Sequence, residues 1–263
     1  MLLALDIGNS NIVLGLLDGD DVRFKERLET RPREDAARAR ARLEQVLPPK
    51  ERATIDGVVL ATVVLPLAPV FAEALEALTG KPVLVVDHLT STGVRLDVDA
   101  PAEVGADRFV NLAALVGRGT EGALVVDFGT ATTIDVLSPD DAFLGGAIAP
   151  GLATTADALR ARAPRLPAVP LSVPASAIGR NTTDALRVGV VLGYAALIDG
   201  LISRMRSELP FPVRVYATGG LAPFVASHCA SIDVVDEDLT LRGLARIHAR
   251  SSRERLTAAA PAM

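Results

Sequence analysis

Two stretches of this chain carry nearly the same pattern, a short apolar run that ends in Asp-x-Gly and continues with small hydroxyl or amide residues. The first runs from Leu3 to Asn11 and the second from Leu124 to Thr132. Such a run is typical of a strand buried on both faces, and the glycine lets the backbone N–H groups approach a ligand. One copy alone is also an ordinary turn. The pair predicts a duplicated fold with a phosphate-binding cleft that receives one carboxylate from each half.

Length and composition agree with two similar globular domains. The chain has 263 residues, 49% of them hydrophobic and 22% charged. This balance indicates a compact fold, and the length suits two cores, which we place at 1–118 and 119–263. The net charge is −5 and the basic residues are dispersed. Nucleic acid is therefore not an expected partner.

The sequence also argues against a membrane or secreted protein. The uncharged run from Gly57 to Ala72 contains two prolines and falls short of the roughly 18 to 20 residues that a membrane helix needs. No basic region precedes the apolar N-terminal residues, so a signal peptide is not expected. A single cysteine, Cys229, excludes an intrachain disulfide. We expect a cytoplasmic protein without a membrane partner.

Periodicity predicts an α/β architecture with mixed sheets, in which each half runs strand, hairpin, strand, helix and again strand and helix. The four prolines between 164 and 174 predict an extended connector. Strands are expected at 2–7, 11–17, 22–28, 57–64, 83–86, 122–126, 133–137, 143–149 and 213–217, and helices at 34–46, 70–78, 106–116, 183–208 and 239–250.

A third candidate element, Gly105-Ala106-Asp107-Arg108, begins a predicted helix. A helix N-terminus favours an anion, and Arg108 could bind a carboxylate with two parallel hydrogen bonds. Asp107 could then accept a proton from a hydroxyl. A helix-start aspartate paired with the adjacent arginine remains the alternative.

Three further motifs are less specific. Gly179 to Thr182 is a capping sequence that could also be a binding loop, and Thr218-Gly219-Gly220 after a strand could face an adenine or ribose or be a simple turn. The Asp-Phe-Gly at Asp127 matches the protein-kinase tripeptide by coincidence, because the other kinase motifs are missing. The three histidines have no metal-ligand spacing and are expected to be surface or packing residues.

Together these motifs resemble the type III pantothenate kinases, which belong to the superfamily of acetate and sugar kinases, heat-shock-type ATPases and actin. The resemblance covers almost the whole chain in the family's order. It implies two ribonuclease H-like domains, a duplicated actin-like ATPase fold with a cleft between them. The matching blocks begin at Asp6, Gly105, Asp127, Gly145, Gly179, Thr218 and Asp238.

The resemblance implies ATP-dependent phosphorylation of pantothenate to 4′-phosphopantothenate, the first step toward coenzyme A, by a homodimer that needs a monovalent cation, K⁺ or NH₄⁺. It implies Asp107 as general base and Asp127 as the monovalent cation ligand. We also expect Asp6 to act through a water of Mg²⁺ and Arg108 to hold the pantothenate carboxylate. The implied ATP contacts are Asp6, Ile7, Gly8, Asn9, Ser10, Asn11, Ile12, Val13 and Thr130, and the implied pantothenate contacts are Gly105, Ala106, Asp107, Arg108 and Thr182.

The chain departs from the family pattern at two places. Ser10 replaces the usual threonine and keeps the hydroxyl, while Val98 stands where the family has a tyrosine that lines the pantothenate site. Two other functions therefore stay open: a non-catalytic nucleotide-binding regulator of the same fold, and a kinase for a different small alcohol.

Overall fold

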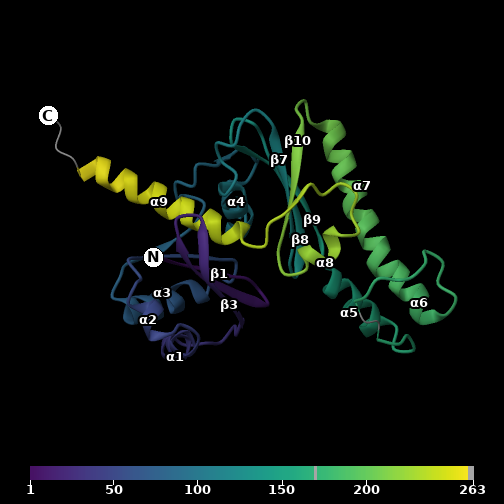
Figure 1. Ribbon diagram of the computed structural model, residues 1–263, viewed down its shortest axis with the longest axis horizontal. Helices are drawn as coiled ribbons and strands as arrows, with labels where there is room; N and C mark the ends of the chain where they lie inside the picture. Colours follow the sequence, from purple (N-terminus) through teal and green to yellow (C-terminus); the bar gives the residue numbers. More distant parts are fainter. Residues whose placement is uncertain (169–170, 260–263) are drawn as a thin grey trace. The chain divides into compact units, whose positions relative to one another are not determined.

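The computed structural model describes residues 1–168 and 171–259. The chain divides into two compact units: Met1–Gly117 together with the chain from Asp238 onward, and Arg118–Glu237. Each unit is an α/β structure built on a mixed sheet, and Figure 1 labels the elements of both.

In the first unit, local signals in the sequence set where the helices begin and end. Asp35 caps the first helix by accepting the Arg38 N–H at 2.9 Å, and Gly80 ends the third helix in a left-handed conformation at φ +66°. The elements are β1 (Leu2–Ile7), β2 (Asn11–Asp18), β3 (Asp21–Glu29), α1 (Ala36–Val46), α2 (Pro49–Arg52), β4 (Gly57–Thr62), α3 (Leu67–Thr79), β5 (Val83–Val85), β6 (Arg95–Leu96), the 3₁₀ helix η1 (Pro101–Glu103), α4 (Ala106–Ala113) and α9 (Leu239–Ala259).

The second unit has a π-helical segment between two α-helices, so the long helix expected at 183–208 is one helical stretch with an irregular centre. The helix from Leu152 was not expected from the sequence. The elements of the second unit are β7 (Gly122–Phe128), β8 (Ala131–Leu137), β9 (Ala142–Pro150), α5 (Leu152–Arg162), α6 (Thr182–Arg187), the π-helix η2 (Val188–Leu192), α7 (Gly193–Glu208), β10 (Val213–Thr218), α8 (Ala222–Ala226) and β11 (Val234–Val235).

The two units repeat one strand topology. The strand order is β3-β2-β1-β4-β5 in the first unit, and in the second it runs β11-β10-β7-β8-β9. In each unit the first three strands pair antiparallel, and the first strand pairs in parallel with the strand that follows the hairpin and its helices. β1 and β7 are therefore equivalent central strands. This repeat confirms the duplicated fold expected from the two Asp-x-Gly stretches and is in keeping with the actin-like fold that the family resemblance implies.

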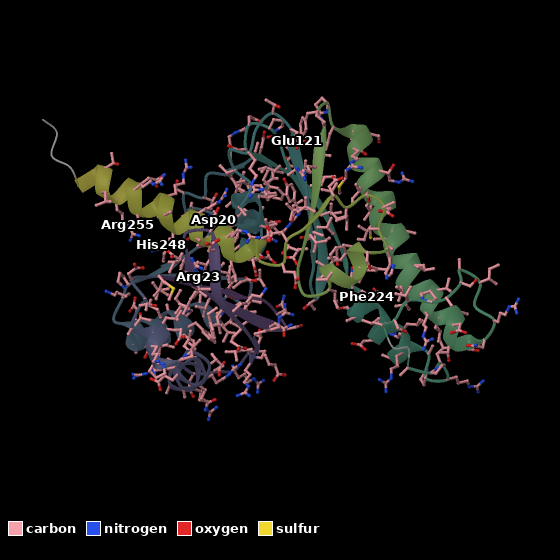
Figure 2. All side chains as sticks on the ribbon, in the orientation of Figure 1. Asp20, Arg23, Glu121, Phe224, His248 and Arg255 are labelled. Atoms are coloured by element: carbon pink, nitrogen blue, oxygen red, sulfur yellow. The ribbon has the colours of Figure 1, made fainter. Side chains whose placement is uncertain are left out.

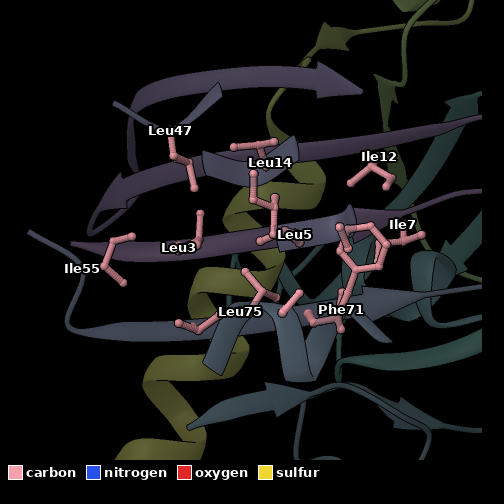
Figure 3. Packing of buried hydrophobic residues seen from close by; sticks show 14 of the residues in the cluster. Leu3, Leu5, Ile7, Ile12, Leu14, Leu47, Ile55, Phe71 and Leu75 are labelled. Atoms are coloured by element: carbon pink, nitrogen blue, oxygen red, sulfur yellow. The ribbon is translucent and has the colours of Figure 1, made fainter. Parts of the chain in front are cut away.

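The core of the first unit packs one face of β1 against α1 and α3. Leu3, Leu5 and Ile7 are fully buried there with Phe71 and Leu75, as Figure 3 shows. Alternate residues of a strand point to opposite faces, so the intervening positions of β1 meet a second layer. The continuous burial of β1 follows from being covered on both faces.

That second layer is formed by α4 and α9, which pack against each other. The helix α9 packs against β1 and β4, and α4 packs against β4. Leu241 packs onto the backbone of Gly15, and His248 onto that of Gly57, where a Cβ atom would lie 2.7 Å from the ring. Arg246 reaches the β2–β3 turn and pairs with Asp20 at 2.8 Å. Figure 2 labels Asp20 and also His248, which belongs to α9.

The sequence predicted a single division of the chain, between residues 118 and 119. The structure differs because α9 belongs to the first unit and not to the second. The first boundary falls between Gly117 and Arg118, but the chain from Asp238 onward belongs to the first unit. The reason is packing, because the apolar residues of α9, such as Leu244 and Ile247, are fully buried in that unit.

The second unit buries Leu124, Val126 and Phe128 of β7 against Ile198 and Ile202 of α7. The expected extended connector has no regular secondary structure over 164–168 and 171–174, while Pro170 lies outside the described residues.

Candidate functional site

The first Asp-x-Gly element lies at the carboxyl end of β1. Asp6 is half-buried, Ile7 and Ile12 have fully buried side chains in the core, and Asn9 and Ser10 are exposed. The isoleucine side chains anchor the loop, so Ile7 and Ile12 could meet a ligand only through their backbone. The exposed face of the loop is made of small polar residues and peptide groups.

Hydrogen bonds within the loop and from the end of β4 hold this loop in place. Inside the loop, the Gly8 N–H donates to Asn11 O at 2.9 Å. On the β4 side, Ile7 O accepts from the Val63 N–H and from Thr62 Oγ1, each at 3.1 Å. The ends of β1 and β4 are thus fixed to each other directly below the loop.

The Gly105–Arg108 element begins α4 in the same unit, as the sequence predicted. Gly105 is the N-cap residue, and a Cβ atom on it would lie 3.5 Å from Val63 Cγ1. Because Val63 also binds Ile7 O, the start of α4 lies at the edge where β1 ends. Asp6 and Asp107 therefore belong to the same end of the first unit.

Burial dominates the electrostatics of Asp107. Its Oδ1 accepts the N–H of the next residue, Arg108, at 2.9 Å. Burial raises the pKa of this carboxyl above its ordinary value, although the Arg108 N–H and guanidinium oppose the rise. A carboxylate with a raised pKa is a stronger base than an exposed one. Ala106 is buried, so little of its side chain is open to a ligand and its contribution would come mainly from the backbone.

The second Asp-x-Gly element lies at the carboxyl end of β7 and matches the first. Asp127 is half-buried, Phe128 is buried, and Gly129 and Thr130 are exposed. The Gly129 N–H donates to Ala131 O at 3.1 Å. This loop, 129–130, is one residue shorter than the loop 8–10 between β1 and β2.

Two glycines approach the second loop too closely for any side chain. A Cβ atom on Gly219 would lie 2.4 Å from Asp127 Oδ1, and its φ of +92° is in the region that favours glycine. A Cβ atom on Gly151 would lie 2.3 Å from Gly129 O. The Thr218-Gly219 turn noticed in the sequence thus places bare backbone against Asp127.

One buried contact next to this loop was missed from the sequence. The hydroxyl groups of Thr132 and Tyr194 are hydrogen-bonded, both residues are buried, and the Tyr194 ring lies 6.5 Å from that of Phe128. Burial raises the Tyr194 pKa, and the Thr132 bond opposes this. The available signal was a tyrosine in an apolar helix of a chain with only two tyrosines.

Thr182 lies at the first position of α6 in the second unit and is exposed. Asn181 before it is the N-cap, and its side chain accepts the Asp184 N–H at 2.9 Å. The capping interpretation of this motif is therefore confirmed. The exposed Thr182 hydroxyl stays available to a ligand.

The described part of the chain, residues 1–168 and 171–259, has no group of three or more His, Cys, Asp or Glu side chains arranged to hold a metal ion. Within the same residues, the helical stretch Thr182–Glu208 is long and apolar enough to cross a membrane by length and composition alone. That is weak support for a membrane span, because helices packed in a globular core meet the same test.

The fold of this chain is also found in solved structures. A solved structure from Campylobacter jejuni, described as a Baf family transcriptional activator, superposes with a TM-score of 0.63 at 23% identity, covering 95% of this chain and 99% of that one. At this identity the likeness concerns the fold.

Relatives found by sequence have a higher identity to this chain than that structure has. A type III pantothenate kinase of Myxococcus xanthus is 41% identical over 253 residues, 95% of this chain and 99% of the relative. Its counterpart from Thermus thermophilus is 43% identical over 250 residues, 94% of this chain and 98% of the relative. The family model for type III pantothenate kinase matches residues 2–204. By its sequence, this chain belongs to the type III pantothenate kinases.

Proposed function

We propose that this kinase transfers the terminal phosphoryl group of ATP to the primary hydroxyl of pantothenate, with Asp107 as the general base. The observation that carries the assignment is the half-buried position of Asp107 at the start of α4, where partial burial raises the pKa of its carboxyl. A base works best when its pKa approaches the working pH, so the burial of this carboxyl favours proton acceptance from an alcohol.

Phosphate binding is assigned to the two exposed loops. Residues 6–13 supply the first, where Asn9 and Ser10 present small polar side chains and peptide groups, and Thr130 supplies a hydroxyl in the second. Phosphoryl transfer passes through a loose transition state, so holding the phosphates and neutralising their charge matters more than removing the proton.

Asp6 and Asp127 fit the cations that such a reaction uses. Both are half-buried carboxylates at the end of a central strand, and carboxylate oxygens are suitable ligands for hard cations. We assign Mg²⁺ to Asp6 through a bound water, and K⁺ or NH₄⁺ to Asp127. When bound, these ions offset the negative charge of the phosphate oxygens.

Pantothenate is an anion, and the start of α4 suits it. Backbone N–H groups at a helix N-terminus attract negative charge, and the Arg108 guanidinium can bind a carboxylate with two hydrogen bonds. Gly105 and Ala106 contribute backbone, and Thr182 contributes its exposed hydroxyl. Arg108 would hold the carboxylate end of the substrate while Asp107 orients its alcohol.

The assembly that we propose is a cytoplasmic homodimer. Some apolar side chains of the helical stretch 182–208 are exposed and do not belong to the core, among them Leu197, which is 42% exposed. A second copy of the chain could cover this face. The single cysteine, Cys229, is in keeping with a reducing compartment.

The test is Asp107→Asn in the full-length protein, assayed by ADP release with pantothenate, with and without K⁺. Loss of the base should lower turnover by roughly 10²- to 10⁴-fold with little change in ATP binding. Asp21→Asn, an exposed aspartate of the β2–β3 hairpin, is the matched control and should keep wild-type turnover.

Other outcomes identify other functions. Near-normal turnover of Asp107→Asn removes this residue from the base role. A wild-type protein that binds ATP without turnover is a regulator, and turnover only with a different alcohol reflects the replacement of the family tyrosine by Val98.

A further inference from the structure

Thr30 contacts the first loop twice, although it lies outside every motif found in the sequence. It is the first residue after β3 and is 7% exposed. Its Oγ1 donates to Gly8 O at 2.7 Å, and its N–H donates to Ser10 O at 3.0 Å. One buried residue thus holds two carbonyl groups of a three-residue loop.

The bond to Gly8 O also sets the direction of a neighbouring donor. A trans peptide unit is planar, and its N–H points opposite to its C=O. The Gly8 carbonyl shares a peptide plane with the Asn9 N–H. With that carbonyl directed at Thr30, the Asn9 N–H is directed away from Thr30.

The second unit holds its loop at the equivalent place. Gly151, the first residue after β9, donates its N–H to Thr130 O at 3.1 Å, and Thr154 Oγ1 donates to the same oxygen at 2.6 Å. Thr130 and Ser10 are each the last loop residue before the second strand of their hairpin. The backbone N–H bond therefore recurs in both halves, but the hydroxyl bond differs. The exposed Thr154 donates to the last carbonyl of its loop, whereas the buried Thr30 donates to the first, Gly8 O.

We propose that Thr30 is a positioning residue for ATP, which fixes the Gly8–Asn9 peptide so that the Asn9 N–H meets a phosphate oxygen. The inference rests on the assignment of ATP to residues 6–13. Thr30 is shielded from water, so loss of its hydroxyl leaves Gly8 O without this donor and frees the peptide to rotate. At the exposed Thr154, water can replace the hydroxyl.

The experiment compares Thr30→Val, which loses the hydroxyl at nearly constant shape, with Thr30→Ser, which keeps it. For Thr30→Val, KM for ATP should rise about 3- to 10-fold, the equivalent of one neutral hydrogen bond, with KM for pantothenate within about twofold of wild type. Thr30→Ser should restore KM for ATP to near the wild-type value. Thr154→Val should change it by less than about twofold.

Asp6→Asn, assayed alongside, distinguishes a failure of the Thr30 positioning role from a failure of the assignment of ATP to residues 6–13. If Asp6→Asn raises KM for ATP but Thr30→Val does not, the positioning role is overturned and the loop assignment stands. If neither changes KM for ATP, the loop assignment fails. A valine variant that changes both KM values equally, or a serine variant that does not restore ATP binding, also overturns the role. Should Thr30→Val not fold, Thr30→Ala is measured with the same expectations.

Discussion

Gly219 lies so close to Asp127 that a methyl group on its α-carbon would approach Asp127 Oδ1 to 2.4 Å and Phe128 N to 2.7 Å. Backbone from the end of β10 therefore closes one side of the carboxylate assigned to the monovalent cation. Neither neighbour can move easily, because Phe128 belongs to the buried core. This contact makes Gly219 a sensitive position for both stability and function.

Gly219→Ala should lower the free energy of unfolding by about 2 kcal/mol or more, since it combines a clash with strain at positive φ. Displacement of Asp127 should also weaken activation by K⁺. Urea unfolding and K⁺ titration of activity measure the two effects. Gly200→Ala, on a helix with open space around it, is the control and should be neutral or stabilising. A wild-type response to K⁺ in Gly219→Ala would contradict the prediction.

Tyr194→Phe should lower the free energy of unfolding by about 1 to 2 kcal/mol, because the buried Thr132 hydroxyl loses its partner. Thr132→Val should have a similar cost. If the bond is the cause, the double variant will cost clearly less than the sum of the two, which a double-mutant cycle by urea unfolding measures. Additive costs would show that the two hydroxyl groups act separately.

His248 should make the fold less stable in mild acid. Burial, followed by the positive charge of Arg255, lowers the pKa of its imidazole, and Asp56 only partly opposes this. The unfolded chain takes up a proton near pH 6.5 while the folded chain resists it, so the free energy of unfolding falls as pH drops from about 7 through the lowered pKa. His248→Gln should show a shallower fall between pH 7.5 and 5.5 in urea unfolding; an identical slope would rule out this histidine as the cause.

Asp199 should contribute stability at neutral pH that is lost in acid. Burial raises the pKa of its carboxyl, but hydrogen bonds from the Ser231 hydroxyl and from the N–H groups of Ala230 and Ser231, each N–H at 3.0 Å, outweigh burial and leave the pKa below its ordinary value. The stabilisation is complete above about pH 4 and disappears as pH falls through the lowered pKa. Asp199→Asn should cost about 1 kcal/mol at pH 7 and less at pH 3. An equal cost at both pH values would contradict this.

The sequence predicted the central strands and the duplication because their signals are local. The apolar runs before Asp6 and Asp127 are long enough to mark buried strands, and Asn181 and Gly105 mark the helix starts that the structure has. The family resemblance then supplied roles for these positions that no periodicity could give.

The contacts that the sequence did not reveal join distant segments. Thr30 and Gly8, or Thr132 and Tyr194, become neighbours only when the strands and helices pack. The helix α5 was missed because its polar residues, such as Thr154 and Asp157, give it little apolar periodicity and only Leu152 is buried. The π-helix before Tyr194 has no local signal either, since it depends on a shifted hydrogen-bond register.

The return of α9 to the first unit affects how the chain can fold as it leaves the ribosome. When synthesis reaches Glu237, the second unit is complete, but β1 and β4 still lack α9, one of the two helices that cover their second face. Nascent domains generally fold as units, so here the later-made unit can mature first. The N-terminal half must keep an apolar sheet face open until the last helix is made, and that interval is when the nascent chain most needs protection from aggregation.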